Sequence, residues 1–254
     1  MRYGISNFSI IPMRADPTDL SEMVNQVLFG EQYKIIDIRK KFSKIRLSHD
    51  KYEGWICNKQ ILEIEKSYYD DLLSSDKNHT TDLLDVIKSD SFQTIVMGSV
   101  LPKIENSIFK FNNIDYSFDG LTVNGEQSKE MLVETAMMYL NAPYLWGGRT
   151  PFGIDCSGFS QMVYRLNGIN IPRDAKDQAE LGSTLSFVEE SESGDLAFFD
   201  NKEGEIVHVG IVLDNNHIIH ASGKVRIDKI DQQGIFNIEK GNHTHKLRLI
   251  KSYL

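Results

Sequence analysis

A single cysteine at the start of an amphipathic run is the feature that most restricts how this chain can fold. The cysteine lies in Asp155-Cys156-Ser157-Gly158, shortly after a Gly147-Gly148 turn. Phe159 and Val163 are four residues apart and share one face, which predicts a helix that begins at Cys156. Unpaired N–H groups and the positive end of the dipole at a helix start favour a thiolate. The pattern therefore predicts a nucleophilic cysteine at the end of a packed helix.

Two histidines further along the chain are suited to activate that cysteine. A nucleophilic thiol needs an imidazole that takes its proton and a third group that orients the imidazole. His208 lies in an apolar stretch that predicts a strand, and Gly210 on the same face leaves room for a close approach. His220 lies on the next predicted strand, and the short Asp214-Asn215 connection makes the two strands antiparallel neighbours. We therefore expect Cys156 as the nucleophile, His208 as the base and His220 as the orienting group.

Two other interpretations of these side chains stay open. A histidine in a strand is often a hydrogen-bonded core residue without catalytic function. A zinc site made of Cys156, His208 and His220 is compatible with the ligand types, but the sequence supplies no fourth ligand and no short metal-type spacing. We therefore expect neither a metal nor a cofactor. The remaining histidines lie in polar surroundings typical of loops or strand ends: His49, His79, His217, His243 and His245.

The charge and the cysteine count exclude several classes of protein. The net charge of −8 disfavours nucleic acid or an anionic membrane as the main partner, since either favours a basic face. No run is long and apolar enough to cross a bilayer, and the N-terminus lacks the layout of a secretory signal. Two cysteines are too few for a disulfide framework, and Cys57 in a predicted strand is expected to be a buried apolar residue. We expect a cytoplasmic monomer.

The sequence pattern changes near Gly125. Before this residue, short alternating segments separated by turn residues predict two small β-barrels, over residues 1–66 and 67–125. After it, two predicted helices precede several strands, which indicates an α+β domain over residues 126–254. A short helix or turn is also predicted in the first barrel from helical spacing. The residues that carry this spacing are Leu20, Met23, Val24 and Val27.

Five short motifs, taken in order, carry a family resemblance. They are Pro143-Tyr144-Leu145-Trp146-Gly147-Gly148, Asp155-Cys156-Ser157-Gly158-Phe159, Ile171-Pro172-Arg173, Gly194-Asp195-Leu196-Ala197-Phe198-Phe199 and His208-Val209-Gly210-Ile211. Together they resemble the NlpC/P60 family of cell-wall peptidases, which implies a papain-like α+β fold and a Cys-His-His triad. The front half is similar to bacterial SH3-like barrels. Two such barrels before this domain resemble the γ-D-glutamyl-L-diamino acid endopeptidases of the dipeptidyl-peptidase VI type, which cut muropeptides.

The resemblance implies roles for residues around the triad. The backbone N–H of Cys156 and the hydroxyl of Tyr144 would stabilise the oxyanion. Asp155 and Ser157 would line the substrate groove, and Trp146 would form an apolar wall.

Further implied roles lie outside the triad motifs. In this subfamily the first barrel caps the groove and binds the free amine of an N-terminal L-Ala, which makes Glu31 the acidic candidate and Tyr52 the aromatic one. Arg173 and Asp174 fall near the implied groove. The alternatives are a solvated carboxylate for Glu31, a barrel-surface position for Tyr52, and a surface ion pair for Arg173 and Asp174.

We therefore expect a cysteine hydrolase of muropeptides that acts in cell-wall peptide recycling. The predicted reaction is hydrolysis of the bond between γ-D-Glu and an L-diamino acid, in peptides with a free N-terminal L-Ala. An exported peptidoglycan hydrolase that acts on intact wall is one alternative. A non-catalytic wall-binding module with an inert Cys156 is the other.

Overall fold

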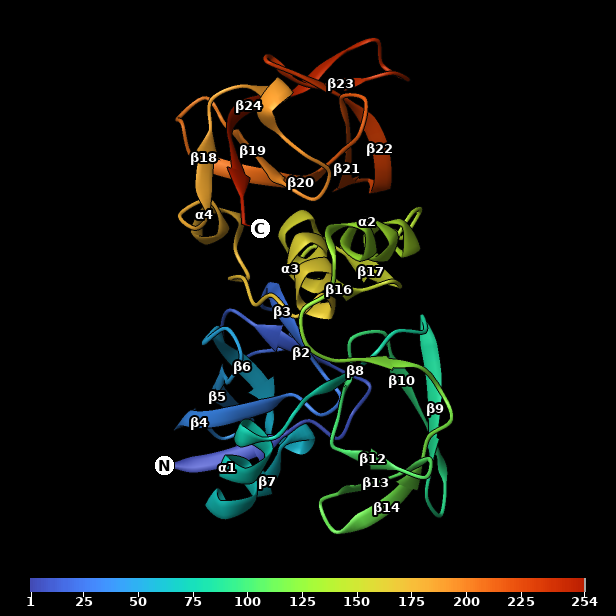
Figure 1. Cartoon of the computed structure of the whole chain (residues 1–254). Helices are drawn as coiled ribbons and strands as arrows, with labels where there is room; N and C mark the ends of the chain where they lie inside the picture. Colours follow the sequence, from blue (N-terminus) through green and yellow to red (C-terminus); the bar gives the residue numbers. More distant parts are fainter. Residues whose placement is uncertain (254) are drawn as a thin grey trace. The chain divides into compact units, whose positions relative to one another are not determined.

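The computed structural model describes residues 1–253 and consists of two compact units, Met1–Gly125 and Glu126–Leu254 (Figure 1). We refer to them as the N-terminal unit and the C-terminal unit. The end of the domain predicted over 126–254, Leu254, lies outside the described residues. The division between the two predicted barrels, 1–66 and 67–125, stays a prediction.

The first sheet of the N-terminal unit is antiparallel throughout, in the order β3-β2-β6-β5-β4-β1-β7. Alternate residues of its strands point inward, and Tyr33, Ile45 and Ile56 are fully buried in the resulting core. The elements are β1 (Arg2–Ile5), β2 (Ile10–Arg14), β3 (Met23–Leu28), β4 (Gln32–Ile38), β5 (Phe42–Leu47), β6 (Glu53–Cys57), the 3-10 turn η1 (Asn58–Gln60) and β7 (Leu62–Ile64).

Of the short helix or turn predicted from Leu20 to Val27, the helix is wrong, because Leu20 lies in a turn and residues Met23–Leu28 form strand β3. This strand pairs with β2, and Val27 is fully buried in the core of the sheet, whereas Leu20 is 97% exposed. Tertiary pairing with β2 overrode the local helical spacing.

The second part of the N-terminal unit has its own core, which also takes in residues from the first strands. Ile87, Ile95 and Phe109 pack there with Ile5 and Phe29. His79, expected in a loop or at a strand end, lies on the short strand β8 and is buried. The elements are α1 (Lys66–Ser74), β8 (Asn78–Thr80), β9 (Leu84–Lys88), β10 (Phe92–Val96), β11 (Val100–Leu101), β12 (Ile104–Glu105), β13 (Ile108–Phe111), β14 (Ile114–Ser117) and β15 (Thr122–Val123).

The C-terminal unit begins with helices, as the sequence predicts. Ser128 caps the first of them, since its side chain accepts a hydrogen bond from the N–H of Met131. The second begins at Cys156, and its Phe159 ring meets Tyr139 edge to face at 5.7 Å between centroids. The helices are α2 (Lys129–Met138), α3 (Cys156–Leu166), α4 (Ala175–Gln178) and the 3-10 turn η2 (Val188–Glu190).

The strands of the C-terminal unit form a sheet that closes on itself. Its order is β18-β24-β19-β20-β21-β22-β23, and β24 also pairs with β23, so β19 to β24 make a barrel (Figure 1). Helices α3 and α4 pack against β20. The strands are β16 (Arg149–Thr150), β17 (Gly153–Ile154), β18 (Ser183–Leu185), β19 (Leu196–Asp200), β20 (Ile206–Leu213), β21 (His217–Ser222), β22 (Lys224–Asp231), β23 (Gly234–Asn237) and β24 (Asn242–Ser252). The closed barrel brings residues of β24 next to residues of β20 and β21.

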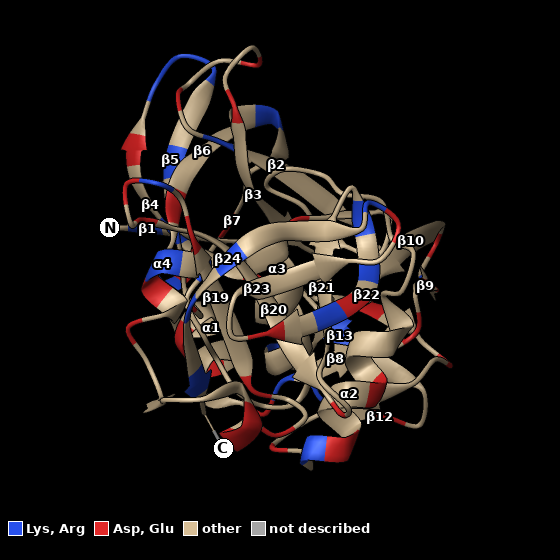
Figure 2. Ribbon diagram, turned by 90° about the horizontal axis from the view of Figure 1, so that it is seen from above, with Lys and Arg blue, Asp and Glu red and all other residues tan. Residues whose placement is uncertain are grey.

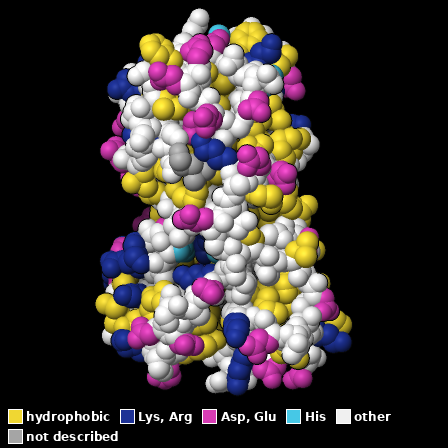
Figure 3. Space-filling view, viewed as in Figure 1, with side chains coloured by type: hydrophobic (Ala, Val, Ile, Leu, Met, Phe, Trp, Pro, Cys, Tyr) yellow, Lys and Arg dark blue, Asp and Glu magenta, His cyan; other side chains and the backbone are white. Residues whose placement is uncertain are grey.

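The distribution of charge is mixed in the described residues. Figure 2 shows acidic and basic residues interspersed along the ribbon, and the face seen in Figure 3 has both signs among apolar side chains. Within residues 1–253, no helix is long and apolar enough to cross a membrane. The expected monomeric state, cytoplasmic location and lack of a nucleic-acid partner stay predictions.

Two substitutions on β20 test the packing of the barrel. Ile211 is fully buried and Val207 is 52% exposed. We expect Ile211→Ala to lower the free energy of unfolding by about 2–5 kcal/mol, because it leaves a cavity. Val207→Ala should change it by about 0.5 kcal/mol or less. Urea unfolding followed by circular dichroism measures both, and equal losses in the two variants would contradict this packing.

Candidate active site

A compact turn holds Cys156 at the first position of α3. The Asp155 side chain caps the helix, since its Oδ1 accepts from the N–H of Gly158 at 2.7 Å and its Oδ2 from the N–H of Gly147 at 2.8 Å. A Cβ on Gly158 would lie 2.3 Å from the carbonyl oxygen of Gly148. The glycines are thus required because the turn and the helix start approach each other so closely.

Arg173 forms a buried ion pair with the capping carboxylate. Its two terminal nitrogens lie 2.6 and 3.0 Å from the Asp155 oxygens, and one of them also donates to Ser157 Oγ at 2.9 Å. Arg173 is 2% exposed, so the alternative of a surface ion pair is wrong. Asp174 precedes α4, and burial raises the pKa of its carboxyl. The groove roles of Asp155, Ser157, Arg173 and Asp174 stay predictions.

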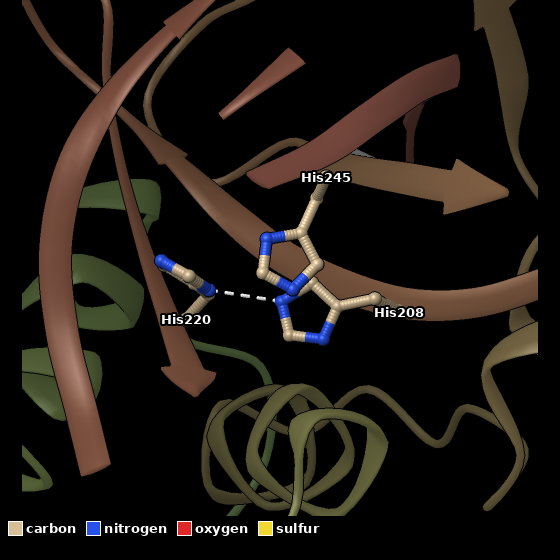
Figure 4. A group of neighbouring side chains, drawn as sticks. All are labelled: His208, His220 and His245. Carbon is tan, nitrogen blue, oxygen red and sulfur yellow. Dashed lines mark hydrogen bonds between the residues drawn. The ribbon is translucent and has the colours of Figure 1, made fainter. Parts of the chain in front are cut away.

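The two predicted histidines meet inside the C-terminal unit. His208 on β20 and His220 on β21 are joined by a hydrogen bond of 2.9 Å between Nε2 and Nδ1 (Figure 4). Gly210 pairs with His220 across the sheet, and a Cβ there would lie 2.9 Å from the His220 Cβ. The glycine therefore makes room for His220 beside His208, as the sequence suggested.

A buried carboxylate continues this chain of hydrogen bonds. Asp228 on β22 is 1% exposed, and its Oδ2 lies 3.1 Å from Nε2 of His220. Arg226 donates to both Asp228 oxygens at 2.7 and 3.1 Å. Burial opposes the ionised form, but the hydrogen bonds from His220 and Arg226 hold the pKa of Asp228 below its usual range. The carboxylate is therefore ionised at neutral pH.

An ionised Asp228 determines which ring nitrogens carry protons. A carboxylate only accepts, so the His220 nitrogen that faces it, Nε2, must donate. Nδ1 of His220 then accepts from Nε2 of His208. This leaves Nδ1 of His208 unprotonated, because burial, His220 and His245 hold the pKa of His208 well below its usual value. The arrangement produces a base at the Nδ1 edge of His208.

The cysteine thiol lies against β20 and is protonated at rest. Backbone N–H groups of Val209, the residue after His208, and of Ser157 stabilise its thiolate form. Burial and the nearby Asp155 charge outweigh them and raise the pKa of the thiol from 9.0 to about 12. The thiolate expected from the helix dipole alone is therefore not the resting form.

Tyr144 and Trp146 follow α2 in the same unit. Burial raises the pKa of the Tyr144 hydroxyl to about 12, and Cys156 and Asp155 add to the shift, so this hydroxyl lies near the thiol. Trp146 is 59% exposed, which suits a wall that a ligand could cover. Their implied roles stay predictions.

Glu31 and Tyr52 belong to the N-terminal unit. The Glu31 side chain is fully buried, accepts from the N–H of Leu28 at 2.9 Å and lies 3.9 Å from Nδ1 of His49. The alternative of a solvated carboxylate is therefore wrong. Tyr52 is partly buried against the core of the first sheet. That both bind a substrate amine stays a prediction.

His245 is a neighbour of the two histidines that sequence reasoning missed. It lies near the start of β24, within the expected loop or strand end, and stacks on His208 with 4.3 Å between ring centroids (Figure 4). Burial, with a contribution from His220, lowers its pKa to about 4. One ring nitrogen each of His208, His220 and His245 lie within 4.8 Å of one another.

Sequence reasoning also missed Asp228 and Arg226. Residues 224–228 alternate charged and apolar side chains, which predicts a strand, and Gly223 predicts a turn before it. A hairpin through that turn pairs Arg226 with His220. The alternation was therefore the signal that could have found both residues.

Comparisons with known proteins agree with this architecture. A model described as NlpC/P60 family matches residues 141–238, and one described as bacterial dipeptidyl-peptidase Sh3 domain matches residues 13–61. A crystal structure of an NlpC/P60 family protein from Bacillus cereus ATCC 10987 has 20% sequence identity over 99% of both chains, with a TM-score of 0.83. The predicted fold class, a papain-like α+β domain with SH3-like sequence before it, is confirmed.

Two curated relatives are peptidases by name. Gamma-D-glutamyl-L-lysine dipeptidyl-peptidase of Bacillus subtilis strain 168 is 37% identical over 48% of this chain, a match that spans 45% of that protein. Dipeptidyl-peptidase 6 of Lysinibacillus sphaericus is 27% identical over 86% of this chain and 88% of its own length. The second match thus extends over both units.

Alkylation of the native protein tests the protonated resting thiol. Because the pKa of Cys156 is raised, its thiolate fraction should grow about tenfold per pH unit throughout the neutral range. We expect the rate of labelling by iodoacetamide, followed by mass spectrometry, to rise from about pH 6 to 9 without a plateau. The Cys156→Ala variant measures the background from Cys57. A plateau near neutral pH would reveal a thiolate–imidazolium pair and contradict this assignment.

Proposed function

We propose that the chain, whose residues 141–238 match the NlpC/P60 family model, is a cysteine peptidase that cleaves the bond between γ-D-Glu and an L-diamino acid in cell-wall peptides. The reaction class follows from the family and the names of both relatives. The observation that carries the proposal is the chain of hydrogen bonds from His208 through His220 to Asp228. It prepares one imidazole to take a proton from Cys156, the cysteine at the start of α3.

In the proposed first step, the Cys156 sulfur attacks the γ-carbonyl carbon of D-Glu while its proton moves to Nδ1 of His208. The proton transfer and the attack occur together, since the thiol is protonated at rest. His208 becomes an imidazolium whose Nε2–H is held by His220, and the Asp228 charge stabilises it. The N–H of Cys156 and the Tyr144 hydroxyl are the proposed donors to the oxyanion.

In the second half of the reaction, His208 returns the proton to the leaving amine of the diamino acid. A thioester between Cys156 and the γ-carboxyl of D-Glu remains. Water then loses a proton to His208 and attacks the thioester, which releases the γ-carboxylate and restores the thiol. No group outside the described residues is needed to balance these protons.

We propose muropeptides with a free N-terminal L-Ala as the substrate, and their recycling as the cellular role. The word dipeptidyl in both relatives' names implies release of a two-residue product from a free amino end. The SH3 match over residues 13–61 includes Glu31, whose carboxylate is buried and would bind an ammonium strongly. In intact wall the same amine is blocked in an amide, so the two substrate classes can be separated by experiment.

A defined peptide tests the activity and its requirement for a free amine. We expect L-Ala-γ-D-Glu-diaminopimelate to yield L-Ala-D-Glu, detected by liquid chromatography and mass spectrometry. Cys156→Ala should lower kcat by at least about a thousandfold, since the nucleophile is lost. Acetylation of the L-Ala amine should lower kcat/KM by about a hundredfold, because a charge-assisted contact is lost. Equal cleavage of the acetylated peptide, or rapid cleavage of sacculi, would instead favour a hydrolase of intact wall.

The Asp228→Asn variant tests the positioning role of the carboxylate. An amide at this site can donate to Nε2 of His220, which reverses the tautomers and leaves Nδ1 of His208 protonated. We expect kcat to fall by about a hundredfold to ten-thousandfold with little change in KM. Glu239→Gln is the matched control, since Glu239 also pairs with Arg226 but its side chain is 73% exposed. Wild-type kcat in a folded Asp228→Asn protein, shown by an unchanged melting temperature, would refute the role.

A further inference from the structure

Three imidazoles converge in the barrel of the C-terminal unit, although the proposed reaction uses only two of them. His208, His220 and His245 come from β20, β21 and β24, and Figure 4 shows the His245 ring lying over His208. One ring nitrogen from each lies within 4.8 Å of the other two. His208 and His220 are 6% and 1% exposed.

In His220 and His245, the ring nitrogen outside the cluster has a hydrogen-bonding partner of its own. Nε2 of His220 meets Asp228, and Nδ1 of His245 lies 2.9 Å from the Thr244 hydroxyl. A carboxylate behind an imidazole is the usual outer partner of a metal-binding histidine, since it fixes the ring and raises the basicity of the inner nitrogen. The inner nitrogens are therefore Nδ1 of His220, which bonds Nε2 of His208, and Nε2 of His245.

We propose that His208, His220 and His245 form a binding site for Zn²⁺, and that the bound ion inhibits the enzyme. Three imidazole nitrogens are a known donor set for zinc, with an open fourth position for water. Imidazole is also among the ligand types that select zinc and its neighbours over magnesium or calcium. The sequence showed no further ligand beside Cys156, His208 and His220, and the closure of the barrel brings His245 to the two histidines.

Only a small rearrangement is needed to bind the ion. Ligand nitrogens around tetrahedral zinc are about 3.3 Å apart, given Zn–N bonds of about 2.0–2.1 Å. The Nε2 of His208 and Nδ1 of His220 are now 2.9 Å apart and share a proton. Zinc binding breaks this hydrogen bond, separates the two nitrogens slightly and draws in His245.

Inhibition follows from the tautomer of His208. In the active form, Nε2 carries the proton and Nδ1 accepts the proton of Cys156. An ion on Nε2 displaces that proton, and the neutral ring then carries its proton on Nδ1. The ring no longer accepts the thiol proton, so the peptidase stops although Cys156 is untouched. The inhibitory consequence rests on the proposed function, whereas metal binding itself does not.

Zinc binding is measured directly on the full chain after removal of metals with EDTA. Competition with a chromophoric zinc chelator gives the stoichiometry and Kd of the wild type and of His245→Gln. We expect one ion per chain, and an affinity at least about tenfold weaker in the variant, because one of three ligands is lost. His243→Gln is the matched control on the same strand, since His243 bonds Asp231 outside the cluster, and it should bind zinc as the wild type does.

The Cys156→Ala variant distinguishes binding of zinc by the three histidines from binding of zinc between the Cys156 thiol and His208. We expect this variant to keep the wild-type Kd, because the three imidazoles remain. Loss of binding in Cys156→Ala, or an unchanged Kd in a folded His245→Gln protein, would overturn the proposal. So would the absence of a tightly bound ion in the wild type.

Peptide cleavage then tests the inhibition. Zinc should inhibit the wild type at the concentration that fills the site, EDTA should restore the rate, and His245→Gln should need at least about tenfold more zinc. Cleavage that continues with the site filled would overturn the inhibitory role. A chain that binds zinc as expected but never cleaves the peptide would refute the proposed function and leave the metal site standing.

Discussion

The hydrogen bond between His208 and His220 is the interaction on which the chemistry of this molecule depends. It joins two strands at 2.9 Å, and Asp228 on a third strand fixes its direction. The carboxylate can only accept, so each proton along the chain has one position, and the last nitrogen is left as a base. Three features of the C-terminal unit keep these residues in place. The barrel closes, Gly210 leaves room for His220 beside His208, and α3 and α4 pack against β20.

The start of α3 is stabilised independently of the histidines. Asp155 caps the helix, accepts from the turn at Gly147 and pairs with the buried Arg173. A buried charge without such partners would cost several kcal/mol, so the ion pair and the turn are mutually dependent. Their combined effect is to fix the start of α3 and, with it, the backbone of Cys156. Two rigid parts, a helix start and a barrel, thus meet at the thiol.

Two opposing effects act on the pKa of the Cys156 thiol, and the larger one decides whether the thiol is protonated at neutral pH. A helix start lowers the free energy of an anion by up to about 2 kcal/mol, which is about one and a half pKa units. Burial and Asp155 act the other way and win, since they raise the pKa of Cys156 from 9.0 to about 12. A thiol that is protonated at rest needs a base before it can act as a nucleophile, which is the role that we propose for His208.

The sequence by itself determined the helix start at Cys156, the strands of His208 and His220 and the α+β class, because each of these depends on local spacing and on short motifs. It did not determine β3, where pairing with β2 overrode a local helical spacing, or the places of Asp228 and His245. These last two residues reach the site only because the sheet closes, with β24 pairing with both β19 and β23. Pairing between strands distant in the chain is a property of tertiary structure, and it alone decided which residues complete the site.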